Sequence, residues 1–194
     1  MACRLARHEG SLLVGKAKGT DIAFLRKRLR ALDSAAEQKF IGLLSAEEKK
    51  IYETATPVGW VPIETSARLQ ELAAPIIFPD NPDCILELGR EQARDDLSGL
   101  YKIIVRFITI PALMKKLSSL WHSYNDTGDL KAVWQEGHRS GQLIIENYPA
   151  LPLTSRLQIQ GYFLGALEMT GAKNVRLIND FTDPLAYKYF GSWE

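Results

Sequence analysis

The last third of the chain, residues 129–193, changes hydrophobic period twice, and this change constrains the fold more than any other feature of the sequence. Short runs of β-branched and aromatic residues occupy 130–135 and 142–148. The turn between them contains Gly137 and Gly141, and glycine can adopt the positive φ angles that tight turns require. This pattern is typical of a β-hairpin.

A helix and a second hairpin follow. Thr154 or Ser155 is the expected N-cap, apolar residues then recur at helical spacing, and Gly171 stands at the position of a C-cap glycine. Strand alternation returns at 174–179 and again at 186–190. The order is therefore ββαββ, and an antiparallel sheet with a helix across one face would bury the apolar sides of these segments.

Residues 20–125 show mostly helical periodicity. Asp21 is the expected cap of the first helix, and residues 45–48 have the form of a capping box. Pro75 should bend or end a later helix. The long segment 83–108 is compatible with one helix or with two. We therefore predict an α+β fold in which N-terminal helices pack with a C-terminal ββαββ antiparallel sheet.

Length and charge narrow the function classes. A chain of 194 residues predicts one domain, 1–194, with a helical half at 20–125 and a ββαββ half at 129–193. A net charge of +1 gives no global electrostatic reason to bind nucleic acid. There is no run of about 18 apolar residues, so we expect neither a membrane span nor a signal peptide. Cys3 and Cys84 match no metal or redox spacing, which favours a reducing, cytoplasmic setting.

Several segments resemble one bacterial family. The segments 120–130 and 162–172, with Trp60-Val61-Pro62 before a helix and the leading segment 16–26, look like a paralogous family of unknown function that is expanded in myxobacteria. That family is similar in architecture to the 4-vinyl reductase small-molecule-binding domain. It is more distantly similar to haem nitric-oxide-binding domains and to vesicle-tethering subunits. The resemblance implies a cavity between helices and sheet, with no particular activity.

Aromatic residues concentrate in the second half of the chain. Such rings can line an apolar pocket with a few polar tips, although they can equally fill the core. The residues that we expect to contact an apolar small molecule are Ile104, Phe107, Leu117, Trp121, Tyr162 and Phe163. We expect no catalytic residue, no metal ligand and no cofactor.

Two residues, His122 and Cys84, suggest more specific chemical roles. His122 is expected near the end of a helix, where an imidazole could bind haem iron or could simply interact with the helix dipole. The Tyr-x-Ser-x-Arg pattern of the haem nitric-oxide family is missing, which favours the dipole. Cys84 is expected to begin a helix, where its thiol is either reactive or structural. His8 and His138 have no companions that would complete a metal site.

Two functions are compatible with these features. The first is a non-catalytic ligand-binding or sensory module, in which ligand binding changes a dimer contact. The alternative is a structural or interaction protein without a ligand, which forms a homodimer or binds a partner through its helices or through a sheet edge such as the 187–193 strand. A third hypothesis, a reductase that acts on a tetrapyrrole, is supported by analogy of fold alone, and such an analogy is weak evidence for a particular reaction.

Overall fold

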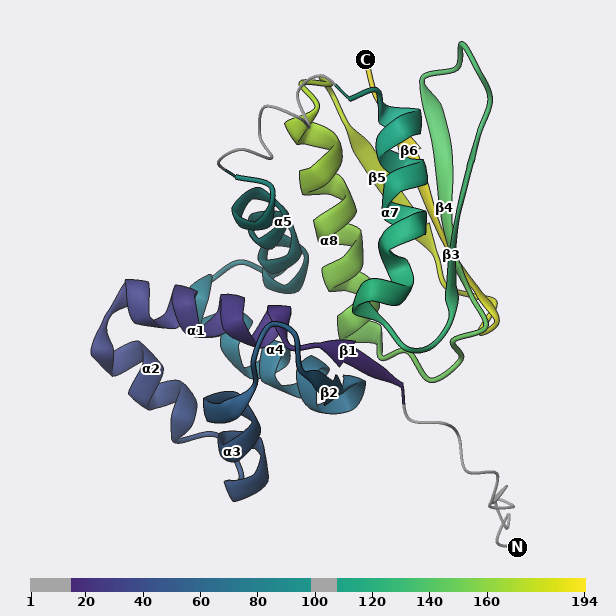
Figure 1. Ribbon diagram of the computed structural model, residues 1–194. Helices are drawn as coiled ribbons and strands as arrows, with labels where there is room; N and C mark the ends of the chain where they lie inside the picture. The colour runs from purple at the N-terminus through teal and green to yellow at the C-terminus, as the bar shows by residue number, and fades with distance from the viewer. Residues whose placement is uncertain (1–14, 99–107) are drawn as a thin grey trace, which may run out of the picture.

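The protein is described by a computed structural model that covers residues 15–98 and 108–194 (Figure 1). The predicted α+β fold is confirmed: helices dominate the first two thirds, and a ββαββ unit forms the last third. The helices are α1 (Thr20–Leu32), α2 (Ser34–Ile41), α3 (Ala46–Thr54), α4 (Ile63–Ile77), α5 (Cys84–Asp96), α7 (Ile110–Tyr124) and α8 (Leu153–Met169). The strands are β1 (Lys16–Lys18), β2 (Trp60–Pro62), β3 (Asp129–Trp134), β4 (Ser140–Glu146), β5 (Arg176–Asp180) and β6 (Ala186–Ser192).

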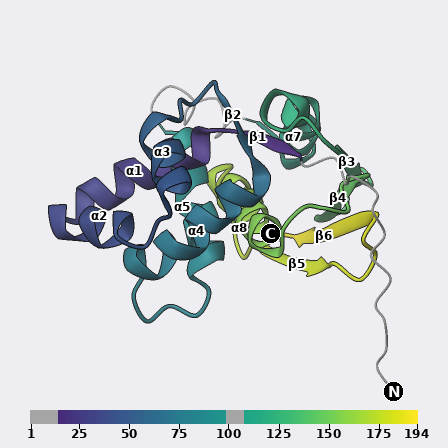
Figure 2. The ribbon, with the colours of Figure 1, turned by 90° about the horizontal axis from the view of Figure 1, so that it is seen from below.

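The C-terminal sheet is antiparallel throughout and has the strand order β3-β4-β6-β5. Side chains alternate across it, so Leu143, Ile145, Tyr187 and Tyr189 face inward and are buried. The helices α7 and α8 cover this inner face, while α1 to α4 lie on the far side of α8 from the sheet (Figures 1 and 2). The sheet, α7 and α8 together enclose one hydrophobic cluster, and α1 to α5 enclose a second.

The position of β6 corrects one prediction. The 187–193 strand was expected at a sheet edge, but β6 lies between β4 and β5 and pairs with both. The edges of this sheet are β3 and β5. Local periodicity defines each hairpin but does not determine which strand of one hairpin pairs with the other. A partner that adds to this sheet would therefore meet β3 or β5.

The helices α5 and α8 cross at glycines, and this crossing joins the helical half to the sheet half. A Cβ atom on Gly161 of α8 would overlap the carbonyl oxygen of Leu86 in α5. Likewise, a Cβ atom on Gly89 of α5 would overlap the carbonyl oxygen of Gln158 in α8. Only glycine allows the two backbones to approach this closely.

Two predicted helix caps turn out differently. Asp21 does not cap α1, because Gly19 occupies the N-cap and Asp21 lies inside the first turn. Pro152 precedes α8 without a side-chain cap, and the hydroxyl of Thr154 instead donates to Glu71 Oε1 at 2.6 Å. In both cases a tertiary contact or a neighbouring residue outweighs the local sequence signal. Pro75 lies inside α4, which ends two residues later, at Ile77.

The capping box of α3 is confirmed. The Ser45 hydroxyl accepts from the Glu48 amide at 3.3 Å, and the Glu48 carboxylate accepts from the Ser45 amide at 2.8 Å. Two of the amide groups that a helix leaves unpaired at its start are thus satisfied.

We expect Ser45→Ala to lower the free energy of unfolding by about 1 kcal/mol, because it removes one cap bond. The measurement is urea unfolding followed by circular dichroism. Ser34→Ala is the control, because Ser34 is an exposed residue in the first turn of α2. Equal midpoints for the two variants would contradict a stabilising role for the cap.

The pair β1–β2 was not predicted. Each strand has only three residues, which is too short to show alternation, yet the pair connects the start of the chain to its middle. Lys16 then binds the α7–β3 loop, since its amide donates to Asp126 Oδ1 at 2.7 Å. Within 15–98 and 108–194, no helix is long and apolar enough to cross a bilayer.

Candidate functional site

Four of the six predicted ligand-contact residues can be placed. Leu117 and Trp121 are on α7, and Tyr162 and Phe163 are on α8. All four belong to the hydrophobic cluster between these helices and the sheet, with Trp121 and Phe163 buried and the other two partly buried. The remaining two, Ile104 and Phe107, lie outside the described residues. The sequence therefore identified residues of one region, and their contact with a ligand remains a prediction.

Aromatic side chains fill much of this region. The Phe163 and Tyr189 rings pack edge to face with centroids 5.4 Å apart, and Phe181 packs against Tyr189 at 5.3 Å. The Trp121 indole N–H donates to the Thr127 carbonyl at 3.1 Å. Among the described residues, a space of about 10 Å³ remains between α7, α8 and the sheet. One water molecule needs roughly this volume, so a larger ligand in this space requires the side chains that line it to move.

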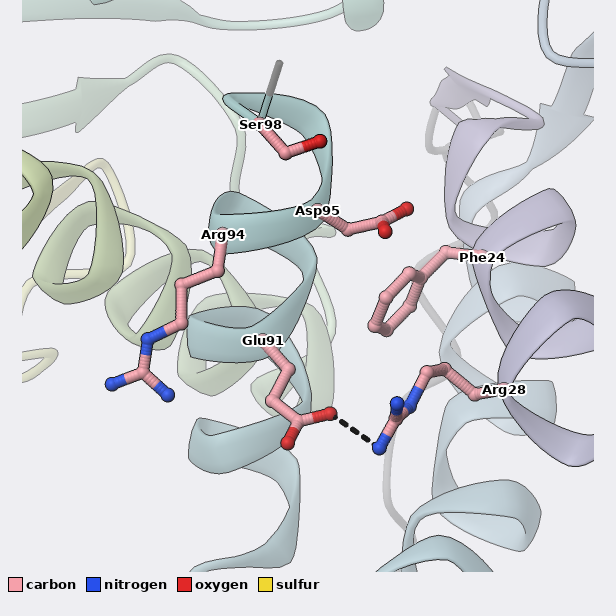
Figure 3. A pocket seen from close by; sticks show the side chains of 6 residues that line it. All are labelled: Phe24, Arg28, Glu91, Arg94, Asp95 and Ser98. Atoms are coloured by element: carbon pink, nitrogen blue, oxygen red, sulfur yellow. Dashed lines mark ion pairs between the residues drawn. The ribbon is translucent and has the colours of Figure 1, made fainter. Parts of the chain in front are cut away.

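A larger hollow of about 280 Å³ lies between α1 and α5 and is open to solvent (Figure 3). Phe24 extends from α1 toward α5, and an ion pair of 2.7 Å joins Arg28 to Glu91 across the hollow. Arg94, Asp95 and Ser98 complete the lining. Charges of both signs and wide exposure distinguish this hollow from the apolar pocket that we expected.

A polar cluster, which we define as Asp21, Ser66, Gln70, Gln92 and Gln158, lies where α1, α4, α5 and α8 meet. The Asp21 carboxylate accepts from Gln92 Nε2 and from Gln70 Nε2, each at 2.9 Å, and from Ser66 Oγ at 3.4 Å. Gln158 of α8 donates to Gln92 Oε1 at 2.8 Å. All of its members except Asp21 are buried, and Asp21 is partly buried. One hydrogen-bonded chain thus connects four helices.

Reasoning from the sequence missed this cluster. Glutamines such as Gln70 and Gln92 are common on solvent-exposed helix faces, and Asp21 was predicted to cap α1. One sequence feature could have indicated that these glutamines are buried, because each is next to an apolar core residue. Gln70 follows the buried Leu69, and Gln92 precedes the buried Ala93.

Asp96, an exposed residue of α5, and Tyr162, a partly buried residue of α8, lie beside this cluster. Burial raises the pKa of Asp96 to about 6, with the like charges of Asp21 and Asp95 adding to the rise. Hydrogen bonding by Tyr162 and Gln92 partly offsets it. Burial also raises the pKa of Tyr162, and the Asp96 charge adds to that rise. Because Asp96 remains exposed to solvent, screening limits the effect of this charge on stability.

Burial also raises the pKa of Asp21, against hydrogen bonds that stabilise its charged form. Gln92, Ser66 and Gln70 provide most of these bonds. The cluster therefore has a carboxyl group, that of Asp21, surrounded by hydrogen-bond donors.

The described histidines do not fit a haem-iron site. His122 Nε2 lies 3.1 Å from Asp129 Oδ1, and 65% of the His122 side chain is exposed. His138 is exposed in the β3–β4 turn, and His8 lies outside the described residues. Within 15–98 and 108–194, no group of three His, Cys, Asp or Glu side chains could hold a metal ion. Cys84 begins α5 as predicted, without any neighbouring ligand set in this part of the chain.

Comparisons with known proteins identify the fold. No protein-family model and no curated protein sequence matches the chain. Solved structures do match: an H-NOX protein from S. oneidensis in the Fe(II)NO ligation state has a TM-score of 0.66 at 10% identity, and covers 91% of this chain and 99% of its own. An Fe(II) unliganded H-NOX protein from K. algicida has a TM-score of 0.63 at 12% identity, with 91% and 96% covered. A point mutant of T. Tengcongensis H-NOX has a TM-score of 0.55 at 13% identity, with 91% and 97% covered.

These structures correct the resemblance inferred from the sequence. They are H-NOX domains, the haem nitric-oxide-binding class that the sequence indicated only as a distant likeness, and not 4-vinyl reductase domains. The resemblance to a myxobacteria-expanded family allied to 4-vinyl reductase is therefore wrong. It was inferred largely from the order of helices and hairpins, and such an order does not distinguish one α+β family from another. At 10–13% identity the likeness to H-NOX domains establishes the fold alone.

Proposed function

We propose that this chain is a non-catalytic sensory module that binds a small, largely apolar molecule between its helices and its sheet. The observation that carries this proposal is the extent of the shared fold. The match covers 91% of this chain and nearly the whole of each H-NOX neighbour. Both the helical half and the ββαββ half are therefore included, and the S. oneidensis neighbour is in the Fe(II)NO ligation state.

The proposed contact residues are those that the sequence indicated. Leu117, Trp121 and Phe163 would provide an apolar surface on α7 and α8, next to the partly buried Tyr162. Ile104 and Phe107 would complete the surface from the segment between α5 and α7. Because the described histidines do not fit an iron ligand, the proposed ligand is an apolar molecule and not a histidine-ligated haem.

Native mass spectrometry of the freshly purified protein, with an absorption scan, tests this proposal. We expect extra mass that is lost on denaturation, without a Soret band. A Soret band would overturn the choice of ligand, and a clean apo mass from cells grown under several conditions would contradict ligand binding.

Substitutions on α7 test whether the ligand binds at the proposed place. Leu117→Ala should lower occupancy by the copurified ligand about tenfold, because a lost buried contact of this size is worth about 1.4 kcal/mol or more. Lys116→Ala, on the exposed face of the same helix, is the control and should leave occupancy unchanged. Equal loss in both variants would place the ligand elsewhere.

A further inference from the structure

The strand β5 leaves one edge of the C-terminal sheet without a pairing partner. It pairs with β6 on one side, and among the described residues no strand lies on its other side (Figure 2). Native proteins commonly protect such edges with proline, a bulge or charged side chains. The strand Arg176–Asp180 contains no proline, and its charged residues stand only at its two ends. The centre of β5 is therefore open to another strand.

The main-chain groups of Leu177 and Asn179 face this free edge. The Trp193 amide donates to the Arg139 carbonyl at 3.0 Å, so the odd-numbered residues of β6 bond to β4 and the even-numbered residues bond to β5. Even-numbered residues of β6 are opposite even-numbered residues of β5, which leaves the odd-numbered residues of β5 facing outward. Gln160 of α8 donates to the Leu177 carbonyl at 2.9 Å, and that oxygen keeps a second lone pair for a partner.

The sequence of β5 is complementary to its own antiparallel copy. A two-fold axis through Ile178, perpendicular to the sheet, would place Arg176 opposite the copy's Asp180 and Asp180 opposite the copy's Arg176. Ile178, which is 67% exposed, would face its own copy in a pair without main-chain bonds, where side chains approach most closely. Opposite charges and apolar pairs placed in this way stabilise antiparallel strands.

The two charged side chains of β5 are available for this pairing. Within 15–98 and 108–194, neither Arg176 nor Asp180 forms an ion pair, although Lys188 is opposite Asp180 in the ladder. Asp180 Oδ1 accepts from the Thr182 amide and hydroxyl, which leaves Oδ2 for a guanidinium group. At the other edge of the sheet, by contrast, Lys131 of β3 forms an ion pair with the neighbouring strand β4. Charge complementarity therefore favours β5.

We propose that β5 pairs with β5 of a second copy of this chain, which joins the two four-stranded sheets into one continuous antiparallel sheet. This interface goes beyond the proposed ligand binding and does not depend on it. The partner is a second copy because the pattern of charges along β5 matches its own reverse. The helices α1 to α4 lie toward one end of the strands (Figure 1), and the two-fold axis would place those of the copy toward the other end.

Sedimentation velocity of the full chain over a range of concentrations tests the proposal. A five-residue strand pair is a small interface, so we expect a monomer–dimer equilibrium with a Kd in the micromolar range. Ile178→Lys should weaken the dimer at least about tenfold, because like charges would meet at the axis. Val133→Lys is the matched control, since Val133 is exposed in the same row of the other edge strand, β3. A monomer at every concentration, a dimer unaffected by Ile178→Lys, or equal loss in both variants would overturn the proposal.

Exchange of the two charges tests the register of the pairing. Arg176→Asp and Asp180→Arg should each weaken self-association about tenfold, because like charges would then be opposite each other. A mixture of the two variants restores opposite charges at both places and should form a heterodimer at least about tenfold tighter than either homodimer. Circular dichroism checks that each variant folds, since Asp180→Arg also loses the bonds to Thr182. Folded variants that do not associate when mixed would contradict this register, and Ile178→Lys decides the question if Asp180→Arg is unfolded.

Hydrogen exchange locates the interface on the sheet. The amides of Leu177 and Asn179 should exchange about tenfold more slowly in a concentrated sample than in a dilute one, because they become bonded to the second copy. The amide of Ala132, which faces the free edge of β3 by the same alternation, should exchange at the same rate in both samples. Slower exchange at Ala132 without a change at Leu177 would place the contact on β3 and contradict the proposal.

Discussion

Gly161→Ala is expected to lower the free energy of unfolding by more than about 4 kcal/mol, a loss that few single substitutions cause. The added Cβ would overlap the Leu86 carbonyl oxygen and would lie 2.8 Å from the Leu86 carbonyl carbon. Neither atom belongs to a flexible side chain, so the helices α5 and α8 would have to separate. Separation would also weaken the bond from Gln158 to Gln92 that links the same two helices. The measurement is the midpoint and slope of urea unfolding.

Gly42→Ala is the matched control for this substitution. Gly42 caps α2 at a φ of −64°, and a Cβ there would meet its nearest neighbours, two carbonyl oxygens of α2, at 3.5 Å. Such a replacement should be neutral or stabilise the fold by about 0.5 kcal/mol, because alanine restricts the unfolded chain. If Gly161→Ala lies within about 1 kcal/mol of the unmodified protein, the close approach of α5 and α8 is not as described.

Tyr189→Ala should cost about 3–5 kcal/mol, the usual loss for removing a large buried ring. Tyr189 is 0% exposed and lies on the central strand β6. Its ring packs edge to face against Phe163 and Phe181, and its hydroxyl donates to the Arg156 carbonyl at 3.1 Å. Thermal unfolding and urea unfolding should both report the loss.

Two neighbouring substitutions separate the causes. Tyr189→Phe removes only the hydroxyl and should cost about 1 kcal/mol. Lys188→Ala changes the preceding residue of β6, which points to the opposite face, and should cost less than about 0.5 kcal/mol. A dimer that dissociates on substitution at Tyr189, without loss of monomer stability, would contradict the central position of β6.

The fold could be predicted where the sequence changes period over many residues. The two hairpins and α8 each span enough residues to show alternation or helical spacing, and Ser45 with Glu48 forms a cap that needs no distant partner. The pairing of β4 with β6 could not be predicted, because it depends on how two similar hairpins meet. The β1–β2 pair was missed for a different reason, which is its length of three residues per strand.

The candidate site was predicted only in part. Trp121 and Phe163 both lie in the hydrophobic cluster between α7, α8 and the sheet, whereas their contact with a ligand stays a prediction. Asp21 was assigned to a cap because Asp is common there, and only its contacts with Gln70 and Gln92 reveal another role. Such contacts join residues 49 and 71 positions apart in the chain, a separation that no local pattern reports.

The glycine crossing of α5 and α8 also limits how the two halves of the molecule can move. Because Gly89 and Gly161 bring backbone against backbone, translation of one helix along the other would drive neighbouring side chains such as Ala93 into the opposing main chain. Gly165 of α8 extends the close contact, because a Cβ atom there would lie 2.6 Å from the Arg90 carbonyl oxygen of α5. A contact that runs along both helices in this way resists tilting as well as sliding, so we expect a displacement of α5 to carry α8, and the sheet packed against it, as one body.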